Sequence, residues 1–348
     1  MMLIKKNKGL DPLIGLTIQE LESFAERLGE KKFRGRQIFD WVYNQKIDDV
    51  FLMTDLPKSF REKLKDLPIH PLKLISNNFS NSKKTRKFLF ELRSGEKIES
   101  VLMQEGNRVT ICLSTQVGCA VDCKFCATAK MGFKKNLTIG EIVDQFIQLQ
   151  IKIDQKITNV VFMGMGEPFL NYKNTIGAAN LLHHAKGINL GAKRITISTA
   201  GIVPKIEQYS KESHPFKLAV SLNGISNDQR LKIMPITKAH TFNKLLKVSK
   251  DYAYKSRNKL TFEYVLLKGI NDNKEDAKKL IFLLEKINCK LNIIPYNEIG
   301  GEFERPSDDR IKEFIKVLRD VSFPVTVRWS KGTDIDAGCG QLVTTVKA

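Results

Sequence analysis

After residue 109, short apolar segments alternate with longer amphipathic ones. The short segments are rich in β-branched residues and almost continuously hydrophobic, which is typical of strands buried on both faces of a sheet. The longer segments repeat apolar residues at helical spacing, most clearly at 138–150, 276–287 and 307–318. About six such units are too few for a closed eightfold barrel. The pattern therefore predicts an α/β fold, a partial (β/α)6 TIM-like barrel.

A different pattern precedes this region. Thr17 and Glu20 form a capping box ahead of a helical repeat that can stop at Gly29, and another short helix is expected around 56–67. Between them, EKKFRGRQIFDWVYNQK interleaves basic and aromatic residues. We expect the aromatic side chains to form the core of a small helical domain, while the basic ones project outward, where they can contact phosphates.

The connection between the two patterns reads as a β-hairpin. Residues 77–87 are polar and basic, as in a linker or a hairpin edge, and FLFEL and IESVLM flank a turn at Ser94 and Gly95. The sequence therefore divides into a helical region over 1–75, a linking hairpin region over 76–108 and the barrel over 109–348.

Composition and charge narrow the functional classes. The chain has 348 residues, of which 42% are hydrophobic, so it can bury a sizeable core and disorder is not expected. Lys and Arg number 57 against 38 Asp and Glu, a net charge of +19. This excess favours a polyanionic partner, nucleic acid before membrane, although a generally basic proteome produces the same balance.

The N-terminus does not resemble a targeting segment. It contains lysines but no apolar run long enough for a signal peptide, and Asp11 and Pro12 interrupt it. No segment approaches the roughly 20 apolar residues that a membrane helix requires. We therefore expect a cytoplasmic protein with no membrane contact.

Cys119, Cys123 and Cys126 form a C-x3-C-x2-C triplet, the main candidate for metal chemistry. Three thiolates on one loop suit iron-sulfur clusters and zinc better than magnesium or calcium. Structural zinc sites and electron-transfer clusters usually take four protein ligands, so a triplet leaves one position open. Cys112 as a fourth zinc ligand, or a distant cysteine completing an ordinary cluster, remain alternatives, whereas a disulfide framework does not fit a reducing compartment.

Polar residues collect where the predicted strands end. Ligands of parallel α/β folds bind at the carboxyl ends of the strands. The residues expected at that rim are Gly166, Glu167, Ser198, Ser221, Leu222, Asn223 and Asn297. Each could be polar only because a loop begins there, but their joint placement on one rim favours a binding site.

The segment GMGEP, residues 164–168, is not a dinucleotide-binding fingerprint, because the third glycine is missing and a proline follows Glu167. It is better interpreted as a turn where the backbone can approach a small ligand and Glu167 can accept hydrogen bonds from an ammonium group.

The two remaining cysteines differ in their surroundings. Cys289 leads into a strand without polar neighbours and is expected to be buried. Cys339 lies between Gly338 and Gly340 in GTDIDAGCGQL, on a loop that follows the last strand. Because the last strand delivers this loop to the same rim, we expect an accessible Cys339 near the triplet.

These motifs together resemble a known family. The triplet with Phe125 before its last cysteine resembles the signature of the radical S-adenosylmethionine superfamily. In combination, QVGCAVDCKFC, MGEPFLN, the SLN after KLAV, and GTDIDAGCGQL closely resemble the RlmN family of RNA methyltransferases, over residues 17–346. The family modifies C2 of adenine in 23S rRNA near the peptidyl transferase centre, and in tRNA just 3' of the anticodon.

The resemblance implies cofactors and their ligands. Cys119, Cys123 and Cys126 would hold a 4Fe-4S cluster, and S-adenosylmethionine would occupy its open iron, with two molecules used per turnover. The glycine-rich turn resembles the motif that holds the cofactor's amino group. The implied cofactor-binding residues are Gly166, Glu167, Ser198, Ser221, Leu222, Asn223 and Asn297. Many relatives have histidine where this chain has Asn223, which leaves that side chain's contribution open.

The resemblance also implies a reaction. Cys339 would first become S-methylcysteine, and a 5'-deoxyadenosyl radical would remove hydrogen from that methyl group. The methylene radical would add to adenine C2 and join RNA to protein. Glu99 would accept the C2 proton, and Cys112 would form a disulfide with Cys339 to release the product.

Further expectations follow from the family. The helical region over 1–75 would bind RNA, a flavodoxin-type protein would supply electrons, and the enzyme would be a monomer. The nearest alternative is the related Cfr type, which methylates adenine C8 in rRNA. An alternative of another class is a zinc-stabilised RNA-binding protein without catalysis.

Overall fold

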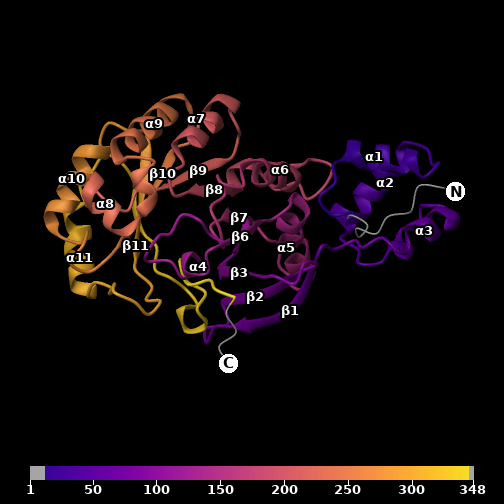
Figure 1. Ribbon diagram of the computed structural model, residues 1–348, viewed down its shortest axis with the longest axis horizontal. Coiled ribbons are helices and arrows are strands. Elements are labelled where there is room, and N and C mark those ends of the chain that lie inside the picture. The colour runs from indigo at the N-terminus through magenta and orange to yellow at the C-terminus, as the bar shows by residue number, and fades with distance from the viewer. Residues whose placement is uncertain (1–11, 345–348) are drawn as a thin grey trace.

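The computed structural model describes residues 12–344, in which a small helical domain lies beside a larger α/β domain (Figure 1). The capping box predicted at Thr17 and Glu20 is present at the start of the first helix. The elements of the helical domain are α1 (Ile18–Arg27), α2 (Phe33–Asp40), the π-helix η1 (Trp41–Gln45), the 3-10 helix η2 (Val50–Leu52) and α3 (Lys58–Leu64). As predicted, aromatic side chains such as Phe39 and Tyr43 form its core.

The larger domain is built on one sheet of ten strands, in the order β1-β2-β3-β4-β7-β8-β9-β10-β11-β12. The first four strands pair antiparallel, and from β4 onward every pairing is parallel. The antiparallel strands are β1 (Leu72–Phe79), β2 (Thr85–Leu92), β3 (Lys97–Glu105) and β4 (Arg108–Cys112). The others are β7 (Asn159–Phe162), β8 (Ile195–Thr199), β9 (Lys217–Ser221), β10 (Leu260–Leu266), β11 (Cys289–Pro295) and β12 (Val325–Val327).

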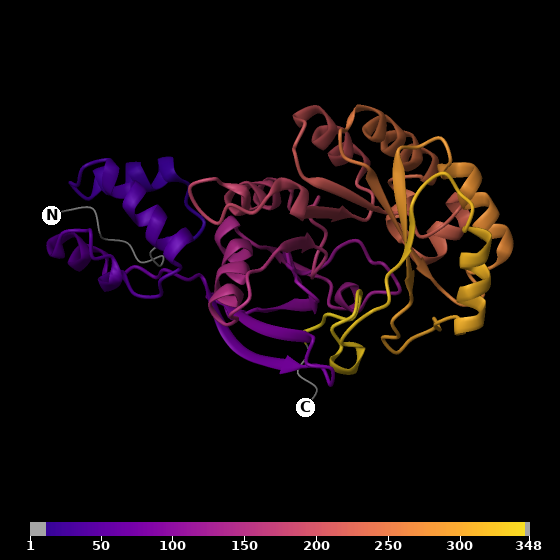
Figure 2. The same ribbon diagram turned by 180° about the vertical axis from the view of Figure 1, so that it is seen from behind.

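Helices connect the parallel strands and cover the outer face of the curved sheet (Figures 1 and 2). The connecting helices are α5 (Ile139–Ile151), α6 (Tyr172–His183), α7 (Val203–Glu212), α8 (Asn227–Ile233), α9 (Phe242–Lys255), α10 (Lys274–Leu284) and α11 (Asp308–Val317), with 3-10 turns η3 (Ala192–Arg194) and η4 (Pro235–Lys238). The partial (β/α) barrel is therefore confirmed. Between residues 12 and 344, no helix is both long and apolar enough to cross a membrane.

Four smaller elements lie near the cysteine triplet and the C-terminal loop. The strands β5 (Gln116–Gly118) and β6 (Phe133–Asn136) form a two-stranded sheet, and the triplet and α4 (Ala127–Lys130) lie between them in the sequence. The 3-10 helix η5 (Thr333–Ile335) precedes Cys339. Both views show the C-terminal segment lying beside β1 to β3. The backbone N–H of Asn81 donates to Asp334 Oδ2 at 2.6 Å, which fixes η5 to the β1–β2 hairpin.

The predicted hairpin is present as β2 and β3, with Glu99 on β3 opposite Leu89. The polar stretch over 77–87 lies in the β1–β2 hairpin, and β1 is an edge strand of the sheet. Since β1 begins at Leu72, the hairpin reaches slightly into the region we assigned to the helical domain. The division at residues 75 and 108 stays a prediction.

The helical domain meets the barrel at α5. The two backbones come so close at Gly15 that a Cβ there would lie 2.7 Å from the Cα of Gly140. His70 Nδ1 lies 2.6 Å from Asp144 Oδ1, and the N–H of Leu72 donates to Asp144 Oδ2 at 3.1 Å. Asp144 is fully buried, so this carboxylate ties the end of the helical domain to the barrel.

We expect the contact between His70 and Asp144 to make stability depend on pH. Burial alone would lower the pKa of His70, but the hydrogen bond and charge of Asp144 outweigh it and raise this pKa above 6.5. Stabilisation from protonated His70 is therefore complete below pH 6.5 and is lost as pH rises through the raised pKa. Asp144→Asn should lower the free energy of unfolding by about 1–3 kcal/mol and flatten this dependence.

Urea unfolding at a series of pH values from about 6 upward measures both effects. Asp154→Asn, an exposed carboxylate beyond the end of α5, is the matched control. A variant profile parallel to that of the wild type would show that this contact does not carry the pH dependence.

Candidate active site

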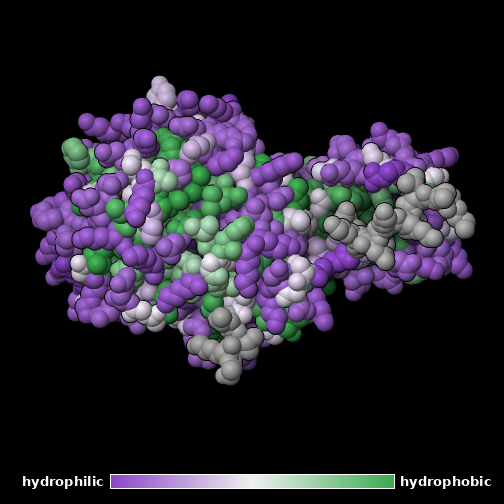
Figure 3. Space-filling view, in the orientation of Figure 1, coloured by the Kyte–Doolittle hydropathy of each residue, from purple (hydrophilic) through white to green (hydrophobic). Residues whose placement is uncertain are grey.

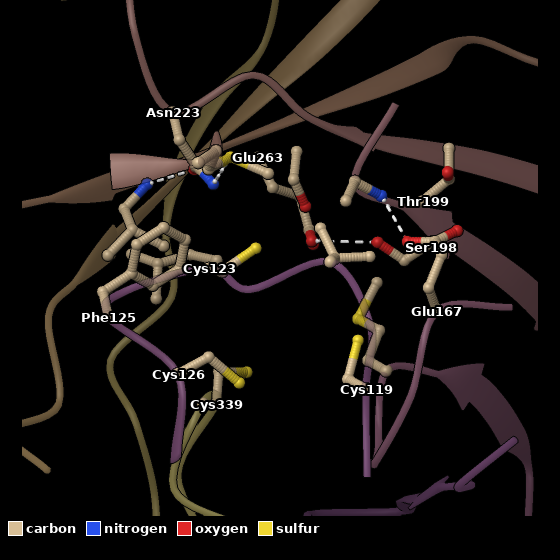
Figure 4. Close-up of a pocket in the computed structure, with 18 of the residues that line it drawn as sticks. Cys119, Cys123, Phe125, Cys126, Glu167, Ser198, Thr199, Asn223, Glu263 and Cys339 are labelled. Carbon is tan, nitrogen blue, oxygen red and sulfur yellow. Dashed lines mark hydrogen bonds between the residues drawn. The ribbon is translucent and has the colours of Figure 1, made fainter. Parts of the chain in front are cut away.

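A cavity opens at the carboxyl ends of the parallel strands, where the sequence places the binding site. All three cysteines of the triplet line it, together with Cys339 and Gly340 from the C-terminal loop. The other predicted residues in its wall are Gly166, Glu167, Ser198, Ser221, Asn223 and Asn297. Figure 4 shows Cys119 on the side of Glu167 and Ser198, with Cys123 and Cys126 across the cavity.

The backbone holds the triplet in place. Gly118 has a φ of +71°, and a Cβ there would lie 1.7 Å from the carbonyl oxygen of Gly132. The N–H of Cys119 donates to that same carbonyl at 3.1 Å. Only glycine therefore allows β5 and β6 to close this tightly around the cysteine loop.

The donor set fits a group larger than a single ion. Within the described residues, no three His, Cys, Asp or Glu side chains form a single-ion site. The triplet instead faces one cavity from separate sides. Burial raises the pKa of all three thiols, to about 12 for Cys119. A bound cation reverses this effect because it stabilises thiolate.

Glu167 ends the glycine-rich turn after β7 and points into the cavity (Figure 4). Burial raises its pKa to about 7, against the hydrogen bonds that its carboxylate accepts. These come from the N–H groups of Ala200 at 2.7 Å and Phe169 at 2.9 Å. Gly166 has a φ of +96°, and a Cβ there would lie 2.5 Å from that of Gln116, so this glycine allows close contact with the segment before the triplet.

Arg230 of α8 is fully buried behind the cavity wall and holds two strand ends together. Its guanidinium donates to the carbonyls of Leu222 at 3.1 Å and Ala200, and to Thr237 Oγ1 at 2.6 Å. Burial lowers its pKa to about 10, while charges on Cys123 and Glu167 act in the opposite direction. A cation therefore lies next to the site without lining it.

Asn223 follows β9 in the left-handed conformation, with a φ of 52°. Asparagine tolerates this region better than most residues. Its Oδ1 accepts from the N–H of Val265 at 2.9 Å, and its Nδ2 lies 3.3 Å from the sulfur of Met234. The side chain lines the cavity, but its amide is already bonded to β10 and to Met234 (Figure 4).

The loop of Cys339 is docked on the triplet loop. The N–H of Ala127, next to Cys126, donates to the carbonyl of Gly340 at 2.7 Å. Asn297 Nδ2 donates to the carbonyl of Cys339 at 2.9 Å. Figure 4 draws Cys339 beside Cys126, and the charge of Cys339 raises the pKa of that thiol after the larger effect of burial. As predicted, the structure brings Cys339 to the triplet.

Cys112, at the end of β4, borders a second cavity instead. It does not line the cavity of the triplet, so the structure does not place it as a fourth ligand there. Cys339, Met163 and Glu263 line both cavities. Burial raises the pKa of Cys112 to about 12, and the charge of Arg328 opposes that rise.

Glu99 lies behind the C-terminal segment and lines neither cavity. Its Oε2 accepts from the N–H of Val343 at 3.0 Å, and Lys87 Nζ lies 3.1 Å from its Oε1. Burial raises the pKa of Glu99, although Lys87 and Val343 act in the opposite direction. The carboxylate is therefore tied to the segment that carries Cys339.

The remaining sequence expectations can be placed as well. Leu222 is buried and does not line the cavity; its carbonyl accepts from Arg230. Cys289 is buried in β11, as predicted. Sequence reasoning did not single out Arg230, Glu263 and Arg328. The last two had a signal, since each is a charged residue within an apolar strand pattern, LTFEYVLL and VTVRW.

Two family models match the chain. One is described as the ribosomal RNA large subunit methyltransferase N-terminal domain and matches residues 12–69, and the other, the radical SAM superfamily, matches residues 113–281. A crystal structure of a radical SAM methyltransferase from Sphaerobacter thermophilus is 42% identical with a TM-score of 0.91, covering 95% of this chain and 98% of that one. The fold and the site therefore define a radical S-adenosylmethionine enzyme.

Curated relatives make the assignment more specific. A protein of Thermotoga maritima named probable dual-specificity RNA methyltransferase RlmN is 44% identical over 331 residues, 95% of this chain and 96% of that protein. The dual-specificity RNA methyltransferase RlmN of Bdellovibrio bacteriovorus is 42% identical over 335 residues, 95% of this chain and 83% of that protein. The chain belongs to the RlmN family of radical S-adenosylmethionine RNA methyltransferases.

Membership confirms the class expected from the motifs. It implies a 4Fe-4S cluster and S-adenosylmethionine as cofactors, and it sets aside the non-catalytic zinc protein.

Replacing Arg230 should affect both stability and cofactor binding. Arg230→Met leaves buried carbonyls of the strand ends without a donor, so we expect a loss of roughly 3 kcal/mol in unfolding free energy. One of those carbonyls belongs to Ala200, which lines the cavity. Because the variant no longer holds this residue in place, S-adenosylmethionine should also bind more weakly. Denaturant unfolding and calorimetric titration of the reconstituted enzyme measure the two effects. Lys232→Met, an exposed change on the same helix, is the control, and an unchanged unfolding midpoint for Arg230→Met would refute the prediction.

Proposed function

We propose that this enzyme methylates C2 of adenosine in 23S rRNA near the peptidyl transferase centre, and in tRNA at the adenosine 3' of the anticodon. The observation that carries the proposal is the docking of the Cys339 loop on the triplet loop, through Ala127 and the carbonyl of Gly340 at 2.7 Å. A thiol that also faces the cofactor cavity can carry a methyl group between cofactor and base. The RlmN relatives are named dual-specificity RNA methyltransferases, which supports a proposal of two RNA substrates.

Cys119, Cys123 and Cys126, which all line the cavity, would hold the cluster. When bound, the cluster and S-adenosylmethionine supply a 5'-deoxyadenosyl radical, and we assign two molecules of S-adenosylmethionine to each turnover. Glu167 would accept the cofactor's ammonium group, since a buried carboxylate gains most from a charged donor. The other residues assigned to the cofactor are Gly166, Ser198, Ser221, Leu222, Asn223 and Asn297. For Leu222, the backbone is the contact that we propose.

Cys339 would act as the methyl carrier. Adenine C2 is an electron-poor aromatic carbon, which makes direct attack on a methyl sulfonium unfavourable and calls for a radical route. Cys339 first takes a methyl group, and its methyl carbon, after losing a hydrogen atom, bonds to C2. Asn297 holds the carbonyl of Cys339 at 2.9 Å, which limits how far the sulfur can move.

Glu99 would accept the proton from C2. Its raised pKa, caused first by burial, makes the carboxylate a stronger base than an exposed one. The ammonium group of Lys87 lies 3.1 Å from Glu99 Oε1. Its positive charge stabilises the buried carboxylate and opposes the rise in the pKa of Glu99. Because Val343 binds the same carboxylate, Glu99 and the Cys339 loop form one connected unit.

Cys112 would release the product. Its thiolate attacks the sulfur of Cys339, an S–S bond forms and the bond from that sulfur to carbon breaks. The electron pair of the broken bond goes to the substrate carbon, which takes up a proton from solvent and becomes the methyl group. Both cysteines border the second cavity, which supports their pairing.

The surface suits RNA. The net charge is +19, and Figure 3 shows a mostly hydrophilic face with hydrophobic residues gathered over the middle of the barrel domain. In the helical domain, the guanidinium carbon of Arg34 lies 4.7 Å from the ring centroid of exposed Phe33, and this pair can stack on a base. We infer that the helical domain binds RNA and that the target base leaves its stack to reach Cys339.

We further infer that the enzyme acts as a monomer in the cytoplasm and that a flavodoxin-type protein supplies its electrons.

The position of the methyl group tests the proposal most directly. Expression in cells that lack their own enzyme should produce 2-methyladenosine in both 23S rRNA and tRNA, as measured by mass spectrometry of nucleosides and mapped fragments. Cys339→Ala is the inactive control. Methylation only at C8 would replace our proposal with the Cfr-type activity, and unmodified tRNA would restrict the substrate to rRNA.

The two cysteines outside the cluster should fail in different ways when replaced. Cys112→Ala should still form S-methylcysteine at Cys339 but accumulate a protein–RNA adduct, visible as a slowly migrating band that ribonuclease removes. Cys339→Ala should form neither and lose more than about 1,000-fold in rate. Cys289→Ala, at a buried cysteine of β11, is the matched control. Multiple turnover by Cys112→Ala without adduct would exclude its role in release.

A further inference from the structure

The chemistry proposed above assigns no ligand to the second cavity, which Cys112 borders. Its volume of about 490 Å³ exceeds the 160 Å³ of the first cavity. Of the two cavities, Cys112 lines only the second, whereas Cys339 lines both. The second cavity therefore borders both cysteines.

The cavity lies inside the incomplete barrel, among the parallel strands, and reaches its lateral gap. Within the sheet, β4 and β12 do not pair, so the parallel strands stop before closing a ring. Val101 and Met103 of β3 line one side of the gap, and Thr326 and Val327 of β12 line the other. An ion pair of 3.0 Å between Lys331 and Glu105 spans it.

The lining of the gap is polar and cationic. Arg108, Lys290, Arg328 and Lys331 contribute four positive charges, against two negative charges from Glu105 and Glu263. Glu105 is paired with Lys331, and Glu263 lies 4.0 Å from Arg328, so Arg108 and Lys290 carry the excess positive charge. Lys290 is partly buried, and burial lowers its pKa, while the charge of Glu263 opposes that shift and the charge of Arg108 adds to it.

The strands add hydrogen-bonding groups to these charges. Side chains of Thr110, Thr196, Thr261, Asn292 and Thr326 line the cavity along the strand bodies. Cationic side chains beside hydroxyl and amide groups are suited to small anions.

We propose that the second cavity admits a small anionic thiol that reduces the disulfide between Cys112 and Cys339 after each turnover. This inference rests on the proposed function, which ends with that disulfide. The cluster and S-adenosylmethionine would occupy the first cavity, so a reductant needs another route. One thiolate attacks the disulfide and forms a mixed disulfide; a second thiolate resolves it. The enzyme gains two electrons and two protons, and the reductant leaves as its own disulfide.

Charged thiol reagents test the route without turnover. The reconstituted holoenzyme with bound S-adenosylhomocysteine is treated with an anionic (sulfonatoethyl) or a cationic (trimethylammonioethyl) methanethiosulfonate. Peptide mass spectrometry measures modification at Cys112. For each reagent, the rate at Cys112 is divided by its rate with a small free thiol, and the anionic value is then divided by the cationic value. Because both reagents react with the same thiolate, the pKa of Cys112 cancels in this ratio. We expect the anionic reagent to be favoured by about fivefold or more at low salt, and less at high salt.

Variants assign that preference to the cavity. Lys290→Gln and Arg108→Gln should each lower the ratio toward one, and exposed Arg108 keeps the test open if Lys290→Gln does not fold. Lys316→Gln, exposed on α11, should keep the wild-type ratio. A wild-type ratio of one or below, no modification of Cys112 by either reagent, or a preference unchanged in both cavity variants would overturn the proposal.

A second measurement separates this proposal from the proposed function. Enzyme that has turned over once is treated with glutathione, with cationic cysteamine, or with thioredoxin, and the disulfide is followed by mass spectrometry. Glutathione should reduce it faster than cysteamine, relative to a free disulfide, and thioredoxin should be slowest. Faster reduction by thioredoxin would overturn the cavity as the route. If no disulfide forms during turnover, the release role of Cys112 fails, while the reagent ratio still reports on the cavity.

Discussion

A buried guanidinium sets the shape of the active site. Arg230 bonds to the carbonyls at the ends of β8 and β9, where the chain leaves the sheet and polar backbone would otherwise be buried without partners. Unsatisfied buried carbonyls are costly, so these loops can hold their positions only with an internal donor. Glu167 accepts from Ala200, the residue whose carbonyl Arg230 binds, so the cofactor side of the cavity depends on this one side chain.

The C-terminal segment completes the other side. Its backbone contacts the triplet loop at Ala127, the end of β11 at Asn297 and the hairpin at Glu99. These anchors lie far apart in the sequence, and together they fix a short loop that has no regular secondary structure around Cys339. If Cys339 carries the methyl group as proposed, it needs this placement, because a small displacement of a reacting atom reduces the rate strongly.

The incomplete barrel gives that thiol two accessible sides. A closed ring would fill the gap between β4 and β12 with side chains, as in an eight-stranded barrel. Here a polar cavity remains inside the incomplete barrel, and Cys339 borders both this cavity and that of the triplet. The same architecture that provides one rim for binding therefore leaves room for the approach to Cys112 that we propose.

The sequence by itself determined the elements, their order and the residues of the triplet, the glycine-rich turn and the Cys339 loop. Hydrophobic periodicity and capping act over a few residues, and the parallel strand rule then gathers the strand ends at one rim. Only the tertiary structure placed Cys112 in a second cavity, turned the amide of Asn223 onto Val265 and joined Glu99 to Lys87 and Val343. It also revealed Arg230, whose sequence context in an amphipathic helix resembles that of an exposed arginine. Such contacts join distant segments, and neither periodicity nor motif spacing carries information about which side chains meet across a cavity wall.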